Sequence, residues 1–426
     1  AQQFQRAASL ICACEFSRRE DETELGTDRI TIGLWVGEGL SPNKRSGAVS
    51  AFRKMTQGTS KENPFVVLKC PWCSAQMGSV YNDRQNRVQG YRHSNNPSTI
   101  VFQCHNTDCD FSDRDFNLPL FVIDEDIYDS PPTLLIGTVD KFAMLPWNPN
   151  ARALFGFREN GRVSPPELII QDELHLISGP LGSMVGHYET LIYTLCKDKS
   201  MAFPVGAKII TSTATISRAK DQCHALYNCG VENVFIFPPQ CLDVGESFFA
   251  YQDKKANGRI YMGIHATGLP SHALTQVRVI SALLQGTKSA FTSNETERNP
   301  YWTILNYFNS LRELGHAATL IRADIREYLN AIWARKGIRK ENDIDMRRFI
   351  NKVIELTSRI PSDEIPRSLQ ELETDYPIVN KNYPVDMCLA TNMISVGVDI
   401  PRLGLMTVIG QPKTTSEYIQ ATSRVG

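Results

Sequence analysis

The 426-residue sequence predicts an α/β protein built from two parallel-sheet lobes, the first of which carries a small four-cysteine insertion. Strand-like apolar segments alternate with amphipathic helical segments up to about residue 240, which is typical of doubly wound sheets. Residues 235–240 read as a last strand with a proline-marked exit, and a second alternating segment starts at Gly258. We therefore expect a first lobe at residues 1–242, an insertion at residues 62–118, and a second lobe at residues 243–426.

The composition is that of a folded protein with no overall attraction for nucleic acid. Lys and Arg total 45 against 46 Asp and Glu, a net charge of −1, so any grip on phosphate must come from local patches and backbone amides. No apolar run is long enough to span a membrane. The 11 cysteines lack the spacing of a secreted disulfide framework, which favours reduced thiols and a cytoplasmic location.

Two close cysteine pairs about thirty residues apart have the spacing of a tetrahedral zinc site. The four residues are Cys70, Cys73, Cys104 and Cys109. The polar sequence between the pairs has little core of its own, so structural Zn²⁺ would supply the missing folding energy. The alternatives are four unrelated buried cysteines, or a site in which His93 or His105 replaces one of them. A zinc-deaminase site is excluded by order, because the H-x-E motif ending at Glu189 follows both pairs.

Two adjacent acids, Asp172 and Glu173, directly follow the apolar residues 167–171, which predict a buried strand. Open α/β sheets bind their ligands at the carboxyl ends of the strands. At such an end, one acid can hold Mg²⁺ while the other orients and deprotonates an attacking water, as nucleotide hydrolysis requires. The alternative is an ordinary pair of solvated surface charges.

Further polar groups follow predicted strands downstream. The hydroxyl cluster at residues 211–215 can bond the acid pair and contact a γ-phosphate, or it can cap a helix. Gly397 and Asp399 follow the strand at 385–390. Gln420 and Arg424 lie four apart on one face of a predicted helix, where the arginine can neutralise charge on a transferred phosphoryl group. The alternatives are an ordinary turn glycine and a helix-surface cation.

The order of these groups resembles motifs II, III, V and VI of the superfamily 2 helicases. The motifs are D-E-L-H at 172–175, T-A-T at 213–215, T-N-M-I-S-V-G-V-D-I-P from residue 391, and Q-A-T-S-R-V-G from residue 420. The resemblance implies two RecA-like lobes that bind ATP and Mg²⁺ between them, with Asp172, Glu173, Gln420 and Arg424 as catalytic residues. It also implies that six residues contact the nucleotide or couple its hydrolysis to movement: His175, Thr213, Thr215, Gly397, Asp399 and Gln420.

Residues 1–8, 32–37, 131–143 and 354–359 resemble one branch of that superfamily, the DrmA helicases of DISARM phage-defence systems. This narrower resemblance implies ATP-driven movement on DNA, a second defence protein (DrmB) as partner, and a role against phage DNA. Sequence-independent phosphate contacts are then expected from Thr138, Lys141, Thr391, Ser358 and Arg359. A basic run near Trp333, with Arg335, Lys336 and Arg348, either tracks a DNA backbone or forms a solvated helix face.

The sequence departs from the helicase pattern in one respect. It contains no G-x-x-x-x-G-K-[ST], so the loop that cradles the β- and γ-phosphates is missing, and the second arginine of motif VI is expected just after Gly426. We therefore interpret the sequence as an internal fragment of a longer protein, which by itself should hydrolyse little ATP. Besides the helicase or translocase core, two alternatives stay open: a catalytically inactive zinc-containing DNA-binding scaffold that recruits a partner protein, and an RNA-directed helicase.

Overall fold

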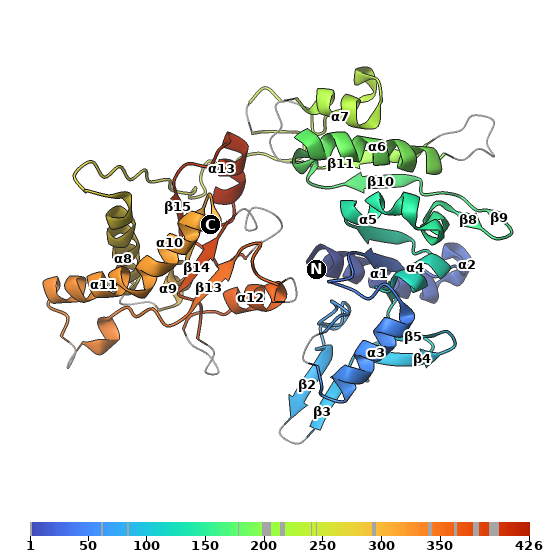
Figure 1. Ribbon diagram of the computed structural model, residues 1–426, viewed down its shortest axis with the longest axis horizontal. Coiled ribbons are helices and arrows are strands. Elements are labelled where there is room, and N and C mark those ends of the chain that lie inside the picture. Colours follow the sequence, from blue (N-terminus) through green and yellow to red (C-terminus); the bar gives the residue numbers. More distant parts are fainter. Residues whose placement is uncertain are drawn as a thin grey trace. The chain divides into compact units, whose positions relative to one another are not determined.

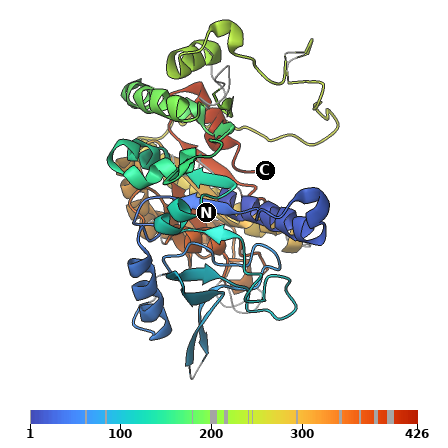
Figure 2. The same ribbon diagram turned by 90° about the vertical axis from the view of Figure 1, so that its right-hand side faces the viewer.

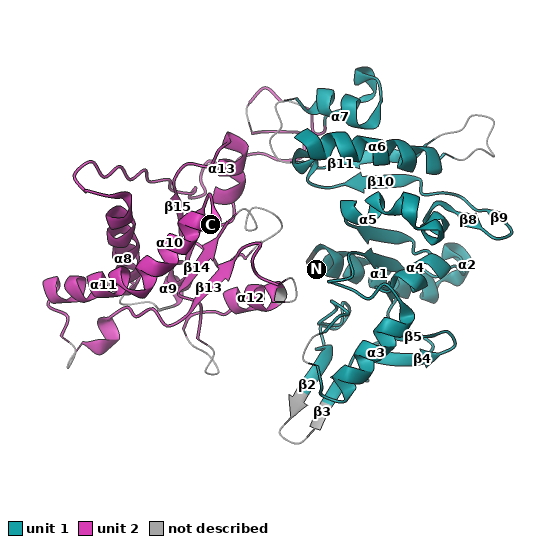
Figure 3. Ribbon diagram, in the orientation of Figure 1, with its two compact units in different colours: residues 1–236 teal, residues 237–426 magenta. Residues whose placement is uncertain are grey.

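The computed structural model describes residues 2–60, 63–82, 85–177, 179–197, 206–213, 218–239, 241–243, 245–291, 295–339, 343–361, 364–377, 383–391 and 400–426. The chain forms two compact units, Ala1–Ile236 and Phe237–Gly426 (Figure 3). Each unit has its own parallel strands and its own hydrophobic core. Within the described ranges, none of the helices is both long enough and apolar enough to pass through a lipid bilayer.

The first unit contains two groups of parallel strands, one in the order β6-β1-β7 and the other a pair of β10 with β11. All four residues of β1 are buried, as expected for the centre of a parallel sheet. The strands are β1 (Ile32–Trp35), β6 (Leu120–Phe121), β7 (Leu134–Gly137), β10 (Leu168–Gln171) and β11 (Lys208–Thr211). The α-helices are α1 (Gln2–Glu20), α2 (Glu22–Leu25), α3 (Arg45–Thr56), α4 (Asp124–Asp129), α5 (Val139–Ala143), α6 (Gly179–Leu195) and α7 (Ala219–Tyr227). Short 3-10 helices are η1 (Leu145–Trp147), η2 (Pro149–Phe155), η3 (Leu174–Leu176) and η4 (Val231–Asn233).

Two antiparallel hairpins interrupt the first unit between β1 and β6. They pair β2 (Gly78–Asn82) with β3 (Gln85–Gln89), and β4 (Tyr91–Asn95) with β5 (Ser98–Phe102). Helix α3 packs along β3 and β5, as Figures 1 and 2 show from two sides. A third, two-residue hairpin joins β8 (Phe157–Arg158) to β9 (Gly161–Arg162). The hairpins between β1 and β6, with the cysteine pairs that flank them, are called the cysteine module below.

The second unit is a four-stranded parallel sheet in the order β13-β14-β12-β15. One core cluster packs α8, α10 and α11 on the sheet, and another includes residues of α12 and α13. The strands are β12 (Ile304–Phe308), β13 (Val353–Leu356), β14 (Met387–Ala390) and β15 (Met406–Ile409). The helices are α8 (His272–Ala290), α9 (Glu295–Trp302), α10 (Leu311–Arg322), α11 (Asp324–Arg335), α12 (Ile365–Leu372), α13 (Thr415–Thr422) and the 3-10 helix η5 (Ile344–Met346).

Helix starts in the second unit follow ordinary capping chemistry. Ser271, Ser310 and Thr414 each accept a hydrogen bond from the backbone N–H three residues on, and so begin α8, α10 and α13. In the last two, the residue three positions on is glutamate, the capping-box pattern. These helices therefore begin where the local sequence favours a start.

The expected parallel-sheet α/β fold is confirmed, as is the presence of a four-cysteine cluster. The interpretation of the two units as RecA-like lobes stays a prediction. Residues 258–264 and 235–239 form no strand. The strand predicted at residues 167–171 forms as β10. The expectation that this strand is buried is wrong, because Leu168 and Ile170 are 48% and 62% exposed.

Candidate nucleotide and metal sites

The acid pair lies where β10 and β11 end side by side. Gln171 and Thr211 are paired in the parallel register. Beyond them the two chains stay bonded, because Ser212 N–H donates to the Gln171 carbonyl at 2.9 Å and Leu174 N–H donates to the Ser212 carbonyl at 3.0 Å. The predicted acids and the predicted hydroxyl cluster therefore meet at one carboxyl-terminal edge, the edge at which parallel sheets bind ligands.

Asp172 is held by three hydrogen-bond donors. The Ser212 hydroxyl donates to Oδ1, as does the Glu173 backbone N–H at 2.9 Å, and the Gln3 amide donates to Oδ2 at 2.7 Å. The Ser212 bond contributes most to lowering the pKa of Asp172, with help from Gln3 and the Glu173 N–H. The carboxylate is thus ionised and fixed in orientation, and it is exposed to incoming ligands.

Glu173 has a backbone conformation that is uncommon for a residue with a side chain, with φ 55° and ψ 43°. Its carboxylate Oε2 lies 3.3 Å from His175 Nδ1. The same His175 nitrogen lies 3.5 Å from the Thr213 hydroxyl, which comes from the β11 side. Backbone strain of this kind clusters at functional sites, and here it turns Glu173 toward the histidine and the hydroxyl loop. Thr215, the other predicted hydroxyl, lies outside the described residues.

Helix α7 supports the loop beneath the acids. The Gln222 amide donates to the carbonyls of Leu174 at 3.1 Å and Ile177 at 2.7 Å. The Tyr227 hydroxyl donates to the side-chain carbonyl of Gln171. Leu174 and Ile177 are themselves buried against α6 and α7. The acid pair therefore stands on a packed base rather than on an isolated loop.

Some of these contacts come from three residues that sequence reasoning did not assign to the site: Gln3, Gln222 and Tyr227. The Ser212 contact agrees with the prediction that the hydroxyl cluster at residues 211–215 can bond the acid pair. No sequence signal pointed to Gln3, because it lies 169 residues from Asp172 in the chain.

Two predicted phosphate-contact residues follow β7 in the first unit. Thr138 is the N-cap residue of α5, and its N–H donates to the Trp35 carbonyl at 3.3 Å. Lys141 is buried, and its ammonium donates to Asp124 at 2.5 Å and to Asn43 at 2.9 Å. A phosphate contact by Lys141 would therefore have to replace an existing buried ion pair.

The other predicted phosphate contacts come together in the second unit. Thr391 N–H donates to the Leu356 carbonyl at 3.4 Å, so the ends of β14 and β13 are adjacent. Ser358 and Arg359 lie two and three residues after the end of β13, and the Arg359 guanidinium bonds the Glu355 carboxylate at 3.1 Å. The predicted Gly397 and Asp399 lie outside the part of the chain that the structure describes.

The expected common helix for Gln420 and Arg424 is corrected by the structure. Gln420 lies in α13, but the helix ends at Thr422 with Ser423 as its C-cap. Arg424 lies in the turn that follows, where its N–H donates to the Ala421 carbonyl at 3.3 Å. The spacing of four thus reflects a helix end and its turn.

The four cysteines of the module form one cluster, with all sulfur atoms within 4.8 Å of one another. Cys73 and Cys104 sulfurs lie 3.5 Å apart, and those of Cys70 and Cys109 lie 4.0 Å apart. A tetrahedron of sulfurs around zinc at about 2.3 Å has edges of about 3.8 Å, so the four thiols fit that ion. Burial raises the pKa of Cys104 to about 12, and a bound cation would supply the charge that its thiolate needs.

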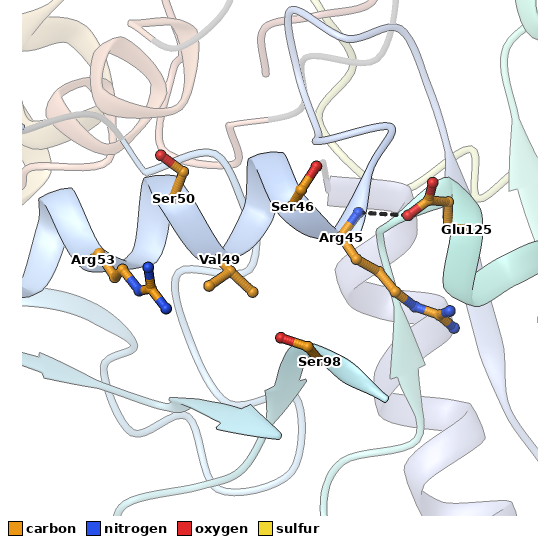
Figure 4. A pocket seen from close by; sticks show the side chains of 7 residues that line it. All are labelled: Arg45, Ser46, Val49, Ser50, Arg53, Ser98 and Glu125. Atoms are coloured by element: carbon orange, nitrogen blue, oxygen red, sulfur yellow. Dashed lines mark hydrogen bonds between the residues drawn. The ribbon is translucent and has the colours of Figure 1, made fainter. Parts of the chain in front are cut away.

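A separate hollow of about 560 Å³ lies beside α3 and is also lined by Ser98 of β5 and Glu125 of α4. Figure 4 shows Ser46, Ser50 and Arg53 of α3 on one side and Ser98, at the start of β5, on the other. The backbone N–H of Arg45, the first residue of α3, donates a hydrogen bond to the Glu125 carboxylate at 2.8 Å. Among the residues that the structure describes, none of the predicted site residues lines this hollow.

Two sequence comparisons relate the chain to known proteins. A family model described as "Helicase conserved C-terminal domain" matches residues 339–426. DISARM protein DrmA of Bacillus paralicheniformis is 36% identical over 471 residues, an alignment that covers 100% of this chain and 39% of that protein. The chain therefore spans about two fifths of the length of this curated relative.

Two helicases are among the solved structures to which this chain shows some similarity. Mycobacterium smegmatis helicase Lhr bound to ssDNA and AMP-PNP is 12% identical with a TM-score of 0.40, over 93% of this chain and 38% of that one. DUF1998 helicase MrfA bound to DNA is 14% identical with a TM-score of 0.40, over 99% of this chain and 44% of that one. On the strength of the sequence match over its whole length and the family model, the chain is related to the helicases and resembles DISARM protein DrmA along its whole length.

Proposed function

We propose that this chain is the core of an ATP-dependent DNA helicase or translocase that works in a DISARM-like defence against phage. The observation that carries the proposal is the fixed, ionised Asp172 beside Glu173 at the shared edge of β10 and β11. The relation to DrmA supports the defence role and a DrmB-like partner. The comparison structures bound to DNA belong to other proteins, so DNA as the substrate is part of the proposal.

The acid pair suits magnesium and water. Carboxylate oxygens are the ligands that Mg²⁺ takes from proteins, alongside substrate phosphates. Mg²⁺ bound with ATP would neutralise charge that develops on the phosphates. Asp172 would hold the ion, and Glu173 would orient the attacking water and accept its proton. His175 lies within reach of both Glu173 and Thr213, and these residues would couple the state of this site to nucleic-acid binding.

The second unit would contribute Gln420 and Arg424 to the same reaction, with Gly397 and Asp399 as further nucleotide contacts. Thr138, Thr391, Ser358 and Arg359 would contact DNA phosphates without reading sequence. Lys141 would join them only by exchanging Asp124 for phosphate. Closure around ATP and release after hydrolysis would then move DNA stepwise.

The decisive experiment measures DNA-stimulated ATP turnover by the full-length protein. We expect DNA to raise turnover, and Glu173→Gln to lower it by roughly a hundredfold or more, because a positioned base is lost. Exposed Glu159→Gln, in the same unit, serves as the matched control and should leave turnover unchanged. Equal turnover in Glu173→Gln and wild type would remove Glu173 from the mechanism, and DNA binding with no turnover at all would favour a scaffold.

The cysteine module is proposed to hold one structural Zn²⁺. Four thiolates close the coordination sphere, which leaves no position for a reacting water. Metal analysis of the purified protein should find about one zinc per chain, and Cys104→Ser should lose it. Cys241→Ser should keep the zinc, because Cys241 is exposed and lies outside the cluster. A folded, metal-free preparation of the wild type would contradict this assignment.

A further inference from the structure

Helix α1 connects the cysteine module to the acid pair. Its first turn carries Gln3, whose amide donates to Asp172 Oδ2 at 2.7 Å. Ser212 holds the other carboxylate oxygen, so the two donors together fix the rotation of the carboxylate. Groups that orient a metal ligand in this way commonly tune its affinity for the ion. Gln3 is thus in the position of a second donor that sets how Asp172 faces an incoming cation.

The middle of α1 rests on the backbone of the cysteine module. The Ser9 hydroxyl donates to the Pro71 carbonyl at 2.7 Å, and the Gln5 amide donates to the Lys69 carbonyl at 3.3 Å. Pro71 lies between Cys70 and Cys73, inside the first cysteine pair. The part of the module that would wrap a zinc ion is therefore the part that the helix touches.

Side-chain packing strengthens the same contact. Phe16 stacks on Trp72 with ring centroids 5.3 Å apart, and Trp72 meets the ring of Phe111 edge-on at 5.6 Å. Trp72 also donates to Asp110, which follows the last cysteine, at 2.7 Å. Phe4 and Ala8 share one buried core with the module's own buried residues. One face of α1 is thus built on the module along most of its length.

The far end of α1 is anchored to the sheet. Glu15 is buried and forms an ion pair with Arg18 at 2.8 Å. The same carboxylate accepts the Ile30 backbone N–H at 2.9 Å, just before β1. Because the carboxyl-terminal end of α1 is fixed, movement of the cysteine module would displace mainly the first turn of the helix, where Gln3 lies.

We propose that the cysteine module is a clamp on α1 which, through Gln3, sets the orientation of Asp172 and so the affinity of the acid pair for Mg²⁺. Gln3 is a positioning residue in this arrangement, and loss of zinc loosens the clamp. The inference rests on the proposed function only in that Asp172 binds the divalent ion. It gives the module a regulatory part as well as a structural one.

The first test is a Mg²⁺ titration of DNA-stimulated turnover by the full-length protein, with Mn²⁺ binding followed by electron paramagnetic resonance. We expect Gln3→Leu to raise the Mg²⁺ concentration for half-maximal turnover about tenfold, the lower end for loss of an orienting partner. Turnover at saturating Mg²⁺ should stay within about twofold of wild type, since the ion can still be driven onto Asp172. Exposed Glu20→Gln, at the other end of α1, is the control.

The second test joins the module to Gln3. Trp72→Ala removes the stacking partner of Phe16 and keeps all four cysteines, and Ser9→Ala is a milder variant in case the first fails to fold. Each should shift the Mg²⁺ requirement in the wild-type background and add nothing to Gln3→Leu. The proposal would be overturned if these shifts add to the shift of Gln3→Leu. It would also be overturned if Gln3→Leu leaves the affinity for Mg²⁺ and Mn²⁺ unchanged.

The third test needs no turnover. Removal of zinc with a chelator should increase hydrogen exchange of the backbone amides in residues 2–20, and restoring zinc should reverse it. If exchange in α1 is unchanged although the zinc is gone, the clamp is excluded. If α1 loosens as expected but the wild type binds no Mn²⁺ and turns over no ATP, the proposed function fails while the mechanical link stands.

Discussion

Asp172 and Glu173 are adjacent in the chain but have different surroundings. Asp172 accepts three hydrogen bonds, and its pKa is lowered, chiefly by Ser212. Glu173 lies near the imidazole of His175, at 3.3 Å, and its backbone is in the left-handed region. Two carboxylates that differ in this way suit two roles, a constant anion for a metal ion and a base for water. The surroundings of the pair, more than its sequence, therefore distinguish it from two solvated surface charges.

Glu189 on α6 is a second unusual carboxyl group, and it gives a pH prediction. Burial raises its pKa from 4.5 to about 7. A carboxyl pKa that is higher in the folded chain gives stability that is complete below about pH 4.5 and is lost as the pH rises through 7. We expect Glu189→Gln to be more stable than wild type by on the order of 2 kcal/mol at pH 8, after allowance for partial exposure.

Urea unfolding curves at pH 5 and pH 8 check this prediction. The advantage of Glu189→Gln should grow between the two pH values, whereas the exposed Glu159→Gln should track the wild type at both. An advantage of equal size at both pH values would show that the carboxyl group does not titrate in that window.

At the scale of elements, a buried ion pair joins the strands of the second unit. The Arg348 guanidinium donates to Asp386 at 2.5 Å and to the Trp302 carbonyl at 2.9 Å, and it lies 3.6 Å from the Trp302 ring centroid. The other Asp386 oxygen accepts the backbone N–H groups of Asn351 and Lys352 at 2.6 and 2.8 Å. The starts of β13 and β14 and the chain entering β12 are thus tied at one point.

Asp386→Ala should destabilise the second unit by about 3 to 5 kcal/mol, because it leaves a buried cation without its partner. The measurement is chemical unfolding followed by far-ultraviolet circular dichroism. Exposed Asp345→Asn in η5 is the control and should change stability by less than about 0.5 kcal/mol. A loss as small as the control's would mean that water or another group satisfies Arg348.

The strands show which elements could be predicted from the sequence and which could not. Apolar runs that gained a strand partner were located within two residues, as for β10 and β14. Residues 235–239 and 258–264 are equally apolar but form no strand, and Phe235 and Ile260 are 87% and 90% exposed. Periodicity describes a side-chain pattern, and it cannot show whether a neighbouring backbone is available for pairing.

The sequence also does not show which groups surround a given side chain in the folded protein. Arg348 belongs to a basic run that we expected either on DNA or on a solvated face, yet it is 1% exposed. Gln3 reaches Asp172 only through the tertiary fold. By contrast, the cysteine cluster was predictable, because two close pairs and a metal radius fix the geometry almost without the rest of the fold. Local chemistry was therefore visible in the sequence, and contacts between distant segments were not.

At the scale of the whole molecule, each unit brings predicted site residues to the carboxyl ends of its parallel strands. The first unit does so with the acid pair at the edge of β10 and β11. The second does so with Thr391 and the Ser358–Arg359 turn beside β14 and β13. Two units with sites at corresponding edges agree with a division of labour in one reaction, which kinetics can test without any assumption about how the units are arranged.

The test is a double-mutant cycle between Glu173 in the first unit and Arg424 in the second. If both residues serve one chemical step, Glu173→Gln and Arg424→Ala should each slow DNA-stimulated turnover strongly, and the double variant should be about as slow as the slower single one. Arg359→Ala, a proposed DNA contact, should instead raise the DNA concentration needed for stimulation and leave maximal turnover within about twofold. Fully multiplicative losses for Glu173 and Arg424 would mean that the two units act independently, and the single-reaction model would have to be abandoned.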